Sequence, residues 1–340
     1  MNDTFLKACR GEQTDYTPVW FMRQAGRYLP EYQAVRSKRT FLELCKNPEL
    51  CTEVTLQPID IFGFDAAILF SDILIPMEAM GLTLEFHEGR GPIFPDPVRE
   101  QAAVDRLRIP DPEETMPFVL ETIRLLRQEL KVPLIGFSGA PFTLATYLIE
   151  GGSSKVFLET KRMAFQEPAM YHALLQKITE CTSIYLQAQA RAGAQALQIF
   201  DSWAGIWAPC DYERFALPYV QSIIADLRKM TDIPIIYFAN NGSTLIRHTK
   251  NAGADVLGLD WRINIGDAVE MVGDHAVQGN LDPIALFLPK EELEQRIKTL
   301  LDDARNAKGH IFNLGHGILP QTDPDQAKIA VDAVHRFSGR

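Results

Sequence analysis

The sequence has no long hydrophobic run, and this argues against a membrane-spanning protein. No apolar stretch approaches the roughly 18 residues that a membrane helix needs, because Asp65 and Asp72 bracket the longest one. The first residues offer neither a basic region that leads into an apolar core nor a cleavage site. We therefore expect neither export nor a membrane partner.

Cysteine and positive charge are both scarce. The five cysteines form an odd set without a C-x-x-C pair, which argues against a disulfide framework or a zinc knuckle: Cys9, Cys45, Cys51, Cys181 and Cys210. A reducing cytoplasm fits this composition best. The net charge of −10 disfavours a nucleic-acid partner. Any anionic ligand would then need a local cationic pocket.

Three common chemistries lack their motifs. The chain has no Walker A or G-x-G-x-x-G phosphate loop. The segment 136–140 lacks the second spaced glycine of a serine-hydrolase elbow. His310 and His316 have no cysteine or carboxylate at ligand spacing, so we expect no metal site.

Eight short apolar runs alternate with helix-period segments and predict a parallel sheet covered on both faces. Eight is the number of units that closes a single (β/α)8 TIM barrel, and an open doubly wound sheet is the alternative. The runs are 19–22, 66–70, 133–137, 194–200, 234–238, 254–259, 276–279 and 310–314.

We expect one domain over residues 1–340, since no long linker or repeat interrupts the chain. Apolar residues return every three or four positions over 121–130 and 173–190, which predicts helices. Asp211 and Asp325 lie where N-caps could begin helices. Residues 81–94, after the second strand, read as a hairpin inserted over one end of the barrel.

Polar or glycine-rich residues follow every predicted strand, at the end of a barrel where catalytic residues lie. Any one such loop is ordinary, but the adjoining glycines would let a ligand approach the backbone. We therefore expect one site on this rim. Its segments are 23–27, 71–72, 138–141, 201–203, 240–242, 260–262, 279–282 and 315–317.

Arg23 and Arg27 could share one solvated helical face, at i and i+4. Gly26 and Pro30 make a helix less attractive, and with Arg36 downstream we favour guanidinium groups that converge on carboxylates.

Four further rim residues each have a structural and a functional interpretation. Asp72 ends an apolar run, so it either pairs with one of the arginines or stabilises a cationic centre in an apolar cleft. Tyr147 is either a packing residue or a ligand contact. Ser202 could cap a helix. His316, between two glycines, lies where backbone and side chain would both face a ligand.

Segments along the whole chain resemble the uroporphyrinogen decarboxylase family. Residues 18–32, PVWFMRQAGRYLPEY, look like its N-terminal signature, and residues 136–144, GFSGAPFTL, resemble its second signature. Further matches are FSDIL at 70–74, FDSWAG at 200–205 and NLGHG at 313–317. We find no departure within these motifs.

The resemblance implies a cytoplasmic homodimer that acts without metal or organic cofactor. As a carboxy-lyase of porphyrin and heme biosynthesis, it would remove CO2 from the four acetate side chains of uroporphyrinogen III and give coproporphyrinogen III. Asp72 would accept hydrogen bonds from the pyrrole N–H groups and stabilise the cation, with Arg23 or a water bound to Asp72 supplying the proton. The implied tetrapyrrole contacts are Arg23, Gln24, Ala25, Gly26, Arg27, Arg36, Asp72, Tyr147, Ser202 and His316.

Two other functions are alternatives to the decarboxylase. A zinc or corrinoid methyltransferase on a related barrel predicts an H-x-C motif and a later cysteine, but Cys181 lies in a predicted helix and Cys210 has no adjacent histidine. A noncatalytic tetrapyrrole-binding protein would not need Asp72, and CO2 release would distinguish it from an enzyme.

Overall fold

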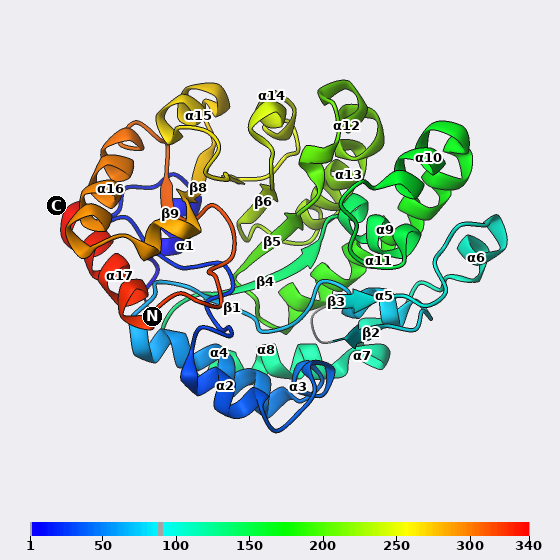
Figure 1. Cartoon of the computed structure of the whole chain (residues 1–340), viewed down its shortest axis with the longest axis horizontal. Coiled ribbons are helices and arrows are strands. Elements are labelled where there is room, and N and C mark those ends of the chain that lie inside the picture. Colours follow the sequence, from blue (N-terminus) through cyan, green and yellow to red (C-terminus); the bar gives the residue numbers. More distant parts are fainter. Residues whose placement is uncertain (1, 88–90, 340) are drawn as a thin grey trace.

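A curled parallel sheet forms the centre of the protein. The computed structural model describes residues 2–87 and 91–339. Seven strands pair in the order β1-β4-β5-β6-β7-β8-β9, each parallel to its neighbours (Figure 1). They are β1 (Ala67–Ile68), β4 (Leu134–Gly139), β5 (Ala196–Asp201), β6 (Ile235–Ala239), β7 (Val256–Gly258), β8 (Ala276–Leu281) and β9 (His310–Leu314). Their side chains are almost all buried, as near-continuous apolar runs predict.

The segment at Val19 occupies the eighth position and closes the barrel. Val19 forms a parallel bridge with Phe312 in β9, and its carbonyl accepts from the backbone N–H of Asp65, just before β1 (2.9 Å). The fold class is thus an α/β barrel, and the open-sheet alternative is wrong. The strand predicted over 19–22 is also wrong in extent, because the backbone N–H of Met22 leaves the ladder and bonds the Asn313 side chain (3.0 Å).

Helices surround the sheet (Figure 1). The α-helices are α1 (Thr4–Cys9), α2 (Pro30–Arg36), α3 (Phe41–Cys45), α4 (Pro48–Phe62), α5 (Ile75–Ala79), α6 (Gln101–Arg106), α7 (Pro112–Thr115), α8 (Pro117–Glu129), α9 (Pro141–Glu150), α10 (Leu158–Gln166), α11 (Pro168–Ala192), α12 (Pro209–Phe215), α13 (Leu217–Arg228), α14 (Ile246–Thr249), α15 (Ile265–Val272), α16 (Lys290–Asp303) and α17 (Pro324–Ser338). Three short 3-10 helices, η1 (Ala204–Ile206), η2 (Ser243–Leu245) and η3 (Pro283–Phe287), follow β5, β6 and β8.

The predicted helices are present as α8 and α11, but the two predicted N-caps are wrong. The residue before α12 is Ala208, and Asp211 lies in its first turn. The N-cap of α17 is Asp323, whose side chain accepts from the backbone N–H of Asp325 (2.9 Å). Proline occupies the first position of each helix, so the caps lie three residues before Asp211 and two residues before Asp325.

An antiparallel ribbon joins β2 (Glu85–His87) to β3 (Gly91–Ile93) within the segment predicted as a hairpin. Residues 88–90 of the predicted hairpin, in its turn over 88–91, lie outside the described residues. The ribbon continues into Phe94, whose N–H donates to the carbonyl of Gly151 at the end of α9 (3.0 Å). That it is an insertion over one end of the barrel stays a prediction, as does the single domain over 1–340.

Candidate active site

The loop after Val19 brings Arg23 against the loop after β9. Arg23 has φ +64, a left-handed backbone conformation that is uncommon for residues other than glycine. The backbone N–H of Ile318 donates to the carbonyl of Met22 (2.9 Å) and ties the two loops together. A Cβ added to Gly317 would lie 2.4 Å from Arg23 Cδ, so the Arg23 side chain rests directly on that glycine. Arg23 and His316 are therefore neighbours on the rim.

Gln24, Ala25 and Gly26 complete the turn behind Arg23. The Gln24 side chain is fully buried and donates to the carbonyl of Ala66 (3.3 Å), while its Oε1 has no hydrogen-bond partner in the described part of the chain. Ala25 and Gly26 are partly exposed. A Cβ at Gly26 would lie 2.9 Å from the carbonyl oxygen of Arg23, so a side chain there would press on the turn.

The other two predicted arginines lie on the surface beside this turn. Arg27 is exposed, and Arg36 ends α2 and donates to the carbonyl of Arg39. Since α2 begins at Pro30, Arg23 and Arg27 do not share a helix, and the interpretation as one solvated helical face is wrong. Burial raises the pKa of Tyr32 to about 12, while the charges of Arg36 and Arg27 act in the opposite direction, so the two arginines lie around one tyrosine.

Asp72 makes no ion pair within 4 Å among residues 2–87 and 91–339, contrary to the structural interpretation. Its Oδ1 accepts from the backbone N–H of Leu74 (2.8 Å), in the turn before α5. Burial raises the pKa of Asp72, while that hydrogen bond and the charge of Arg23 act in the opposite direction. The Asp72 carboxylate thus keeps acceptor capacity for a ligand.

Tyr147 projects from α9 toward the same charges. Burial raises the pKa of its hydroxyl; a hydrogen bond with Trp203 opposes this, and smaller effects come from Asp72 and Arg23. The rings of Tyr147 and Trp203 have centroids 6.2 Å apart. Asp72 after β1, Tyr147 in α9 and Arg23 after the Val19 segment are therefore brought together.

Ser202 does not cap a helix, because η1 begins two residues later, after Trp203. Its carbonyl accepts from Asn240 Nδ2 (3.1 Å), which holds the Ser202 backbone between β5 and β6. The side chain is partly exposed on the rim.

Asp201, which sequence reasoning did not select, is a fully buried carboxylate just before Ser202. It accepts from the hydroxyls of Thr143 (2.6 Å) and Tyr237 (2.8 Å), and the Thr143 oxygen also accepts from the backbone N–H of Trp203 (3.2 Å). Burial raises the pKa of Asp201 to about 6, although both hydrogen bonds lower it. Its position at the end of an apolar strand was the available signal.

Burial, together with the smaller effects of the Arg23 and Arg262 charges, lowers the pKa of His316 to about 4, which favours a neutral imidazole at pH 7. Its ring centroid lies 6.3 Å from that of Phe238 in β6. A neutral imidazole beside a guanidinium group can donate or accept a hydrogen bond without repelling a carboxylate.

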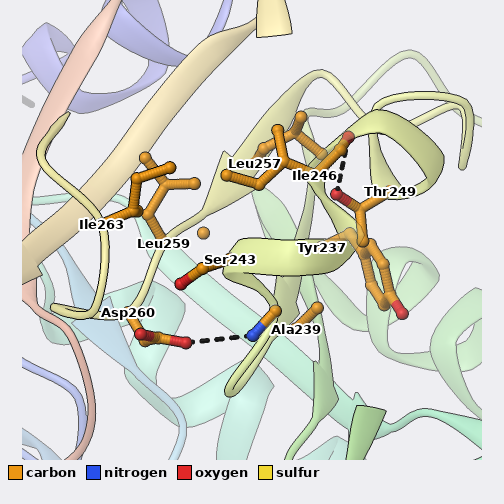
Figure 2. Close-up of a pocket in the computed structure, with 11 residues that line it drawn as sticks. Tyr237, Ala239, Ser243, Ile246, Thr249, Leu257, Leu259, Asp260 and Ile263 are labelled. Atoms are coloured by element: carbon orange, nitrogen blue, oxygen red, sulfur yellow. Dashed lines mark hydrogen bonds between the residues drawn. The ribbon is translucent and has the colours of Figure 1, made fainter. Parts of the chain in front are cut away.

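A small cavity lies between β6, β7 and η2 (Figure 2). Gly242 and Asp260, from two of the predicted rim segments, line it, but none of the ten implied tetrapyrrole contacts does. Asp260 borders it and accepts from the backbone N–H of Gly242 (3.0 Å).

The described residues contain no group of three or more His, Cys, Asp and Glu side chains that could hold a metal ion. The five cysteines are free, and only Cys210 is exposed. In the described ranges, no helix is both long enough and apolar enough to cross a membrane.

Comparison with known proteins gives one consistent result. The family model described as "Uroporphyrinogen decarboxylase (URO-D)" matches residues 1–337. The curated uroporphyrinogen decarboxylase of Desulfotalea psychrophila is 69% identical over 338 residues, and that of Geotalea uraniireducens is 56% identical over 340 residues. Each alignment covers 99% of both chains.

Solved structures show the same fold at low identity. A methyltransferase from Methanosarcina mazei has a TM-score of 0.84 and 22% identity, covering 99% of this chain and 98% of that one. A B12-independent methionine synthase from Shewanella sp. W3-18-1 has a TM-score of 0.58 and 10% identity, covering 85% of this chain and 87% of that one. These likenesses show the fold alone.

Proposed function

Because the chain belongs to the uroporphyrinogen decarboxylase family, we propose that it removes CO2 from the four acetate side chains of uroporphyrinogen III and gives coproporphyrinogen III. The family assignment makes it a carboxy-lyase of porphyrin and heme biosynthesis. Relatives named for this activity align over nearly the whole chain, whereas the methyltransferase likeness is one of fold. The methyltransferase alternative is therefore not favoured.

The observation that carries the mechanism is the Asp72 carboxylate, partly exposed on the rim and without an ion pair in the described chain. Protonating a pyrrole ring carbon turns the ring into an electron sink for the carbon–carbon bond that breaks. Each acetate then releases CO2 and takes up one proton in its place. Asp72 stabilises the positive ring by accepting from its N–H groups, and the low local polarity that raises the Asp72 pKa strengthens that attraction.

The remaining predicted residues bind the carboxylates and orient the ring. Arg23 and Arg27 provide charge on the rim, with Arg36 further out along α2. Tyr147, Ser202 and His316 supply hydrogen-bonding groups from three other strand ends, and residues 24–26 form the cradle below Arg23. Arg23 or a water bound to Asp72 delivers the proton.

The first test is anaerobic incubation of the purified, chelator-treated protein with uroporphyrinogen III, followed by chromatography of the oxidised porphyrins. A series from seven to four carboxylates would establish the reaction and its independence from added metal. No conversion by folded protein that still binds the substrate would favour the noncatalytic tetrapyrrole binder.

We also propose that the protein is a cytoplasmic homodimer and a single domain that needs no metal or organic cofactor. The free cysteines suit a reducing compartment, and one hydrophobic core runs from Phe5 to Val334. Sedimentation velocity tests the dimer, because a 38.3 kDa chain would sediment as a particle of twice that mass. A single species at the monomer mass would refute it.

A further inference from the structure

A second arginine, Arg262, lies beside His316. A Cβ added to Gly315 would lie 2.6 Å from the backbone nitrogen of Trp261, so the loop after β7 packs directly on the residue before His316. The charge of Arg262 lowers the pKa of His316, as that of Arg23 does. The two glycines that flank His316 thus allow two loops to pack closely against it. The loop after Val19 carries Arg23, and the loop after β7 carries Arg262.

The loop that carries Arg262 is fixed at both ends. Asp260 Oδ1 accepts from the backbone N–H of Arg262 (2.8 Å), and its Oδ2 accepts from that of Gly242 (3.0 Å). Asn280 Nδ2 donates to the carbonyls of Asp260 (2.9 Å) and Ile263 (2.8 Å). Binding a ligand at Arg262 would therefore cost little backbone ordering.

The Arg262 side chain contacts Trp261 and Asp260 but stays available for a ligand. Its guanidinium carbon lies 4.0 Å from the centroid of the Trp261 ring. Its NH1 lies 3.4 Å from Asp260 Oδ1, beyond a normal charged hydrogen bond. With 42% of the side chain exposed and five N–H donors, the guanidinium group keeps donors for a ligand.

We propose that Arg262 is a further substrate-binding residue, which pairs with a carboxylate of uroporphyrinogen beside His316 and Arg23. This inference rests on the proposed function. A substrate with eight carboxylates around its ring needs cationic groups on more than one side of the cleft. Arg23, Arg27 and Arg36 all come from the first barrel unit and α2, whereas Arg262 follows β7.

The test compares Arg262→Gln with Arg305→Gln in steady-state decarboxylation of uroporphyrinogen III. Arg305 is a matched control, because it also pairs with a nearby aspartate (Asp302, 2.7 Å) but lies at the end of α16, away from the rim. We expect Arg262→Gln to raise KM about three- to tenfold with kcat within about twofold of wild type, as for a partly solvated charged pair. Arg305→Gln should leave both constants unchanged.

The dependence of KM on NaCl concentration and the conservative variant Arg262→Lys test the charge of Arg262 directly. The KM of Arg262→Gln should rise less steeply with NaCl than that of the wild type, and Arg262→Lys should recover part of the lost affinity. Equal KM values for Arg262→Gln and Arg305→Gln, in protein that decarboxylates uroporphyrinogen, would overturn the role of Arg262. An inactive wild type would instead contradict the proposed function itself.

Discussion

Arg23 depends on a glycine that is distant in sequence. Its φ of +64 is uncommon for an arginine, and its side chain passes over Gly317 with no room for a Cβ. Glycine is therefore needed at position 317 because it leaves space for the Arg23 side chain, and not because of its own backbone conformation.

Gly317→Ala should displace Arg23 while leaving both arginine and histidine in the chain. We expect kcat/KM to fall about 10- to 100-fold, because a misplaced guanidinium group loses its bond to the reacting substrate. The measurement is steady-state decarboxylation, with Gly339→Ala as a control at a glycine that has a backbone oxygen at 3.3 Å and no site residue near it. Wild-type kinetics in Gly317→Ala would contradict the packing argument.

Asp72→Asn should separate binding from chemistry. The amide keeps the shape of the side chain but removes the charge that stabilises the cationic ring, so we expect kcat to fall about 100- to 1,000-fold with KM within about threefold. Single-turnover experiments with uroporphyrinogen III would measure the chemical step directly. Near-normal turnover would rule out the role that we give to Asp72.

The rim of the barrel is more predictable from the sequence than the side-chain contacts within it. Arg23 and Asp72 follow the first two predicted strands, and Tyr147 lies in the helix after the third, an order that is visible in the sequence. The burial of Gln24 and the lack of an ion pair at Asp72 in the described chain depend on side-chain packing between distant loops. Asp201 could have been found from its position at the end of the apolar run of β5. Arg262 lies in a rim segment, but no local pattern distinguishes it from an ordinary loop charge.

At the scale of elements, Asp201 couples β5 to its neighbours. It joins Thr143 in α9 and Tyr237 in β6, and Tyr237 bonds the hydroxyl of Tyr212 in α12 (2.7 Å). Thr143 in turn holds Trp203, the partner of Tyr147. One carboxylate therefore fixes the loop that carries Ser202 and the tyrosine facing Asp72.

The raised pKa of Asp201 gives a pH dependence of stability. Its folded-state pKa of about 6 lies above the ordinary 3.8, so the folded chain binds this proton more tightly. Stability is therefore lost as pH rises through about 6, by about 1.4 kcal/mol between pH 5 and 7.5. Urea unfolding should show that Asp201→Asn lacks this contribution. Asp302→Asn, at an exposed carboxylate, should keep the wild-type dependence, and identical profiles for all three proteins would contradict the prediction.

The elements themselves were predictable where the pattern was continuous. The apolar runs gave the positions of β4, β5, β6 and β9, because fully buried parallel strands need apolar side chains on both faces. The segment at 19–22 has the same apolar character, yet only Val19 pairs. Its length as a strand is set by where Met22 finds the Asn313 side chain, which no local signal reports.

At the scale of the whole molecule, the Asp65 side chain stabilises the closed barrel. This buried carboxylate accepts from the backbone N–H of Val19 (2.8 Å) and from the hydroxyl of Tyr16 (2.7 Å), and it pairs with His335 of α17 (2.8 Å). It thus joins the first barrel unit to the last helix, which Figure 1 shows on the same side of the molecule as the N-terminal segment.

Asp65→Ala should destabilise the entire fold. The substitution leaves the buried N–H of Val19 without an acceptor and breaks a largely buried pair, so we expect the free energy of unfolding to fall by about 3–5 kcal/mol. Asp302→Ala, which removes one partner of an exposed pair, should cost less than about 1 kcal/mol. Urea denaturation followed by circular dichroism measures the stability of both variants. Equal unfolding midpoints for Asp65→Ala and Asp302→Ala would show that Asp65 does not stabilise the closed barrel.

The bridge between Val19 and Phe312 also has a consequence for synthesis on the ribosome. At about 5–20 residues per second, about 15 to 60 s pass between the addition of Val19 and that of Phe312. During that interval Trp20 and Phe21, which are fully buried in the finished protein, have no closed barrel to enter. The nascent chain therefore presents aromatic surface to chaperones until β9 emerges, and Arg23 meets His316 only after that strand has been made.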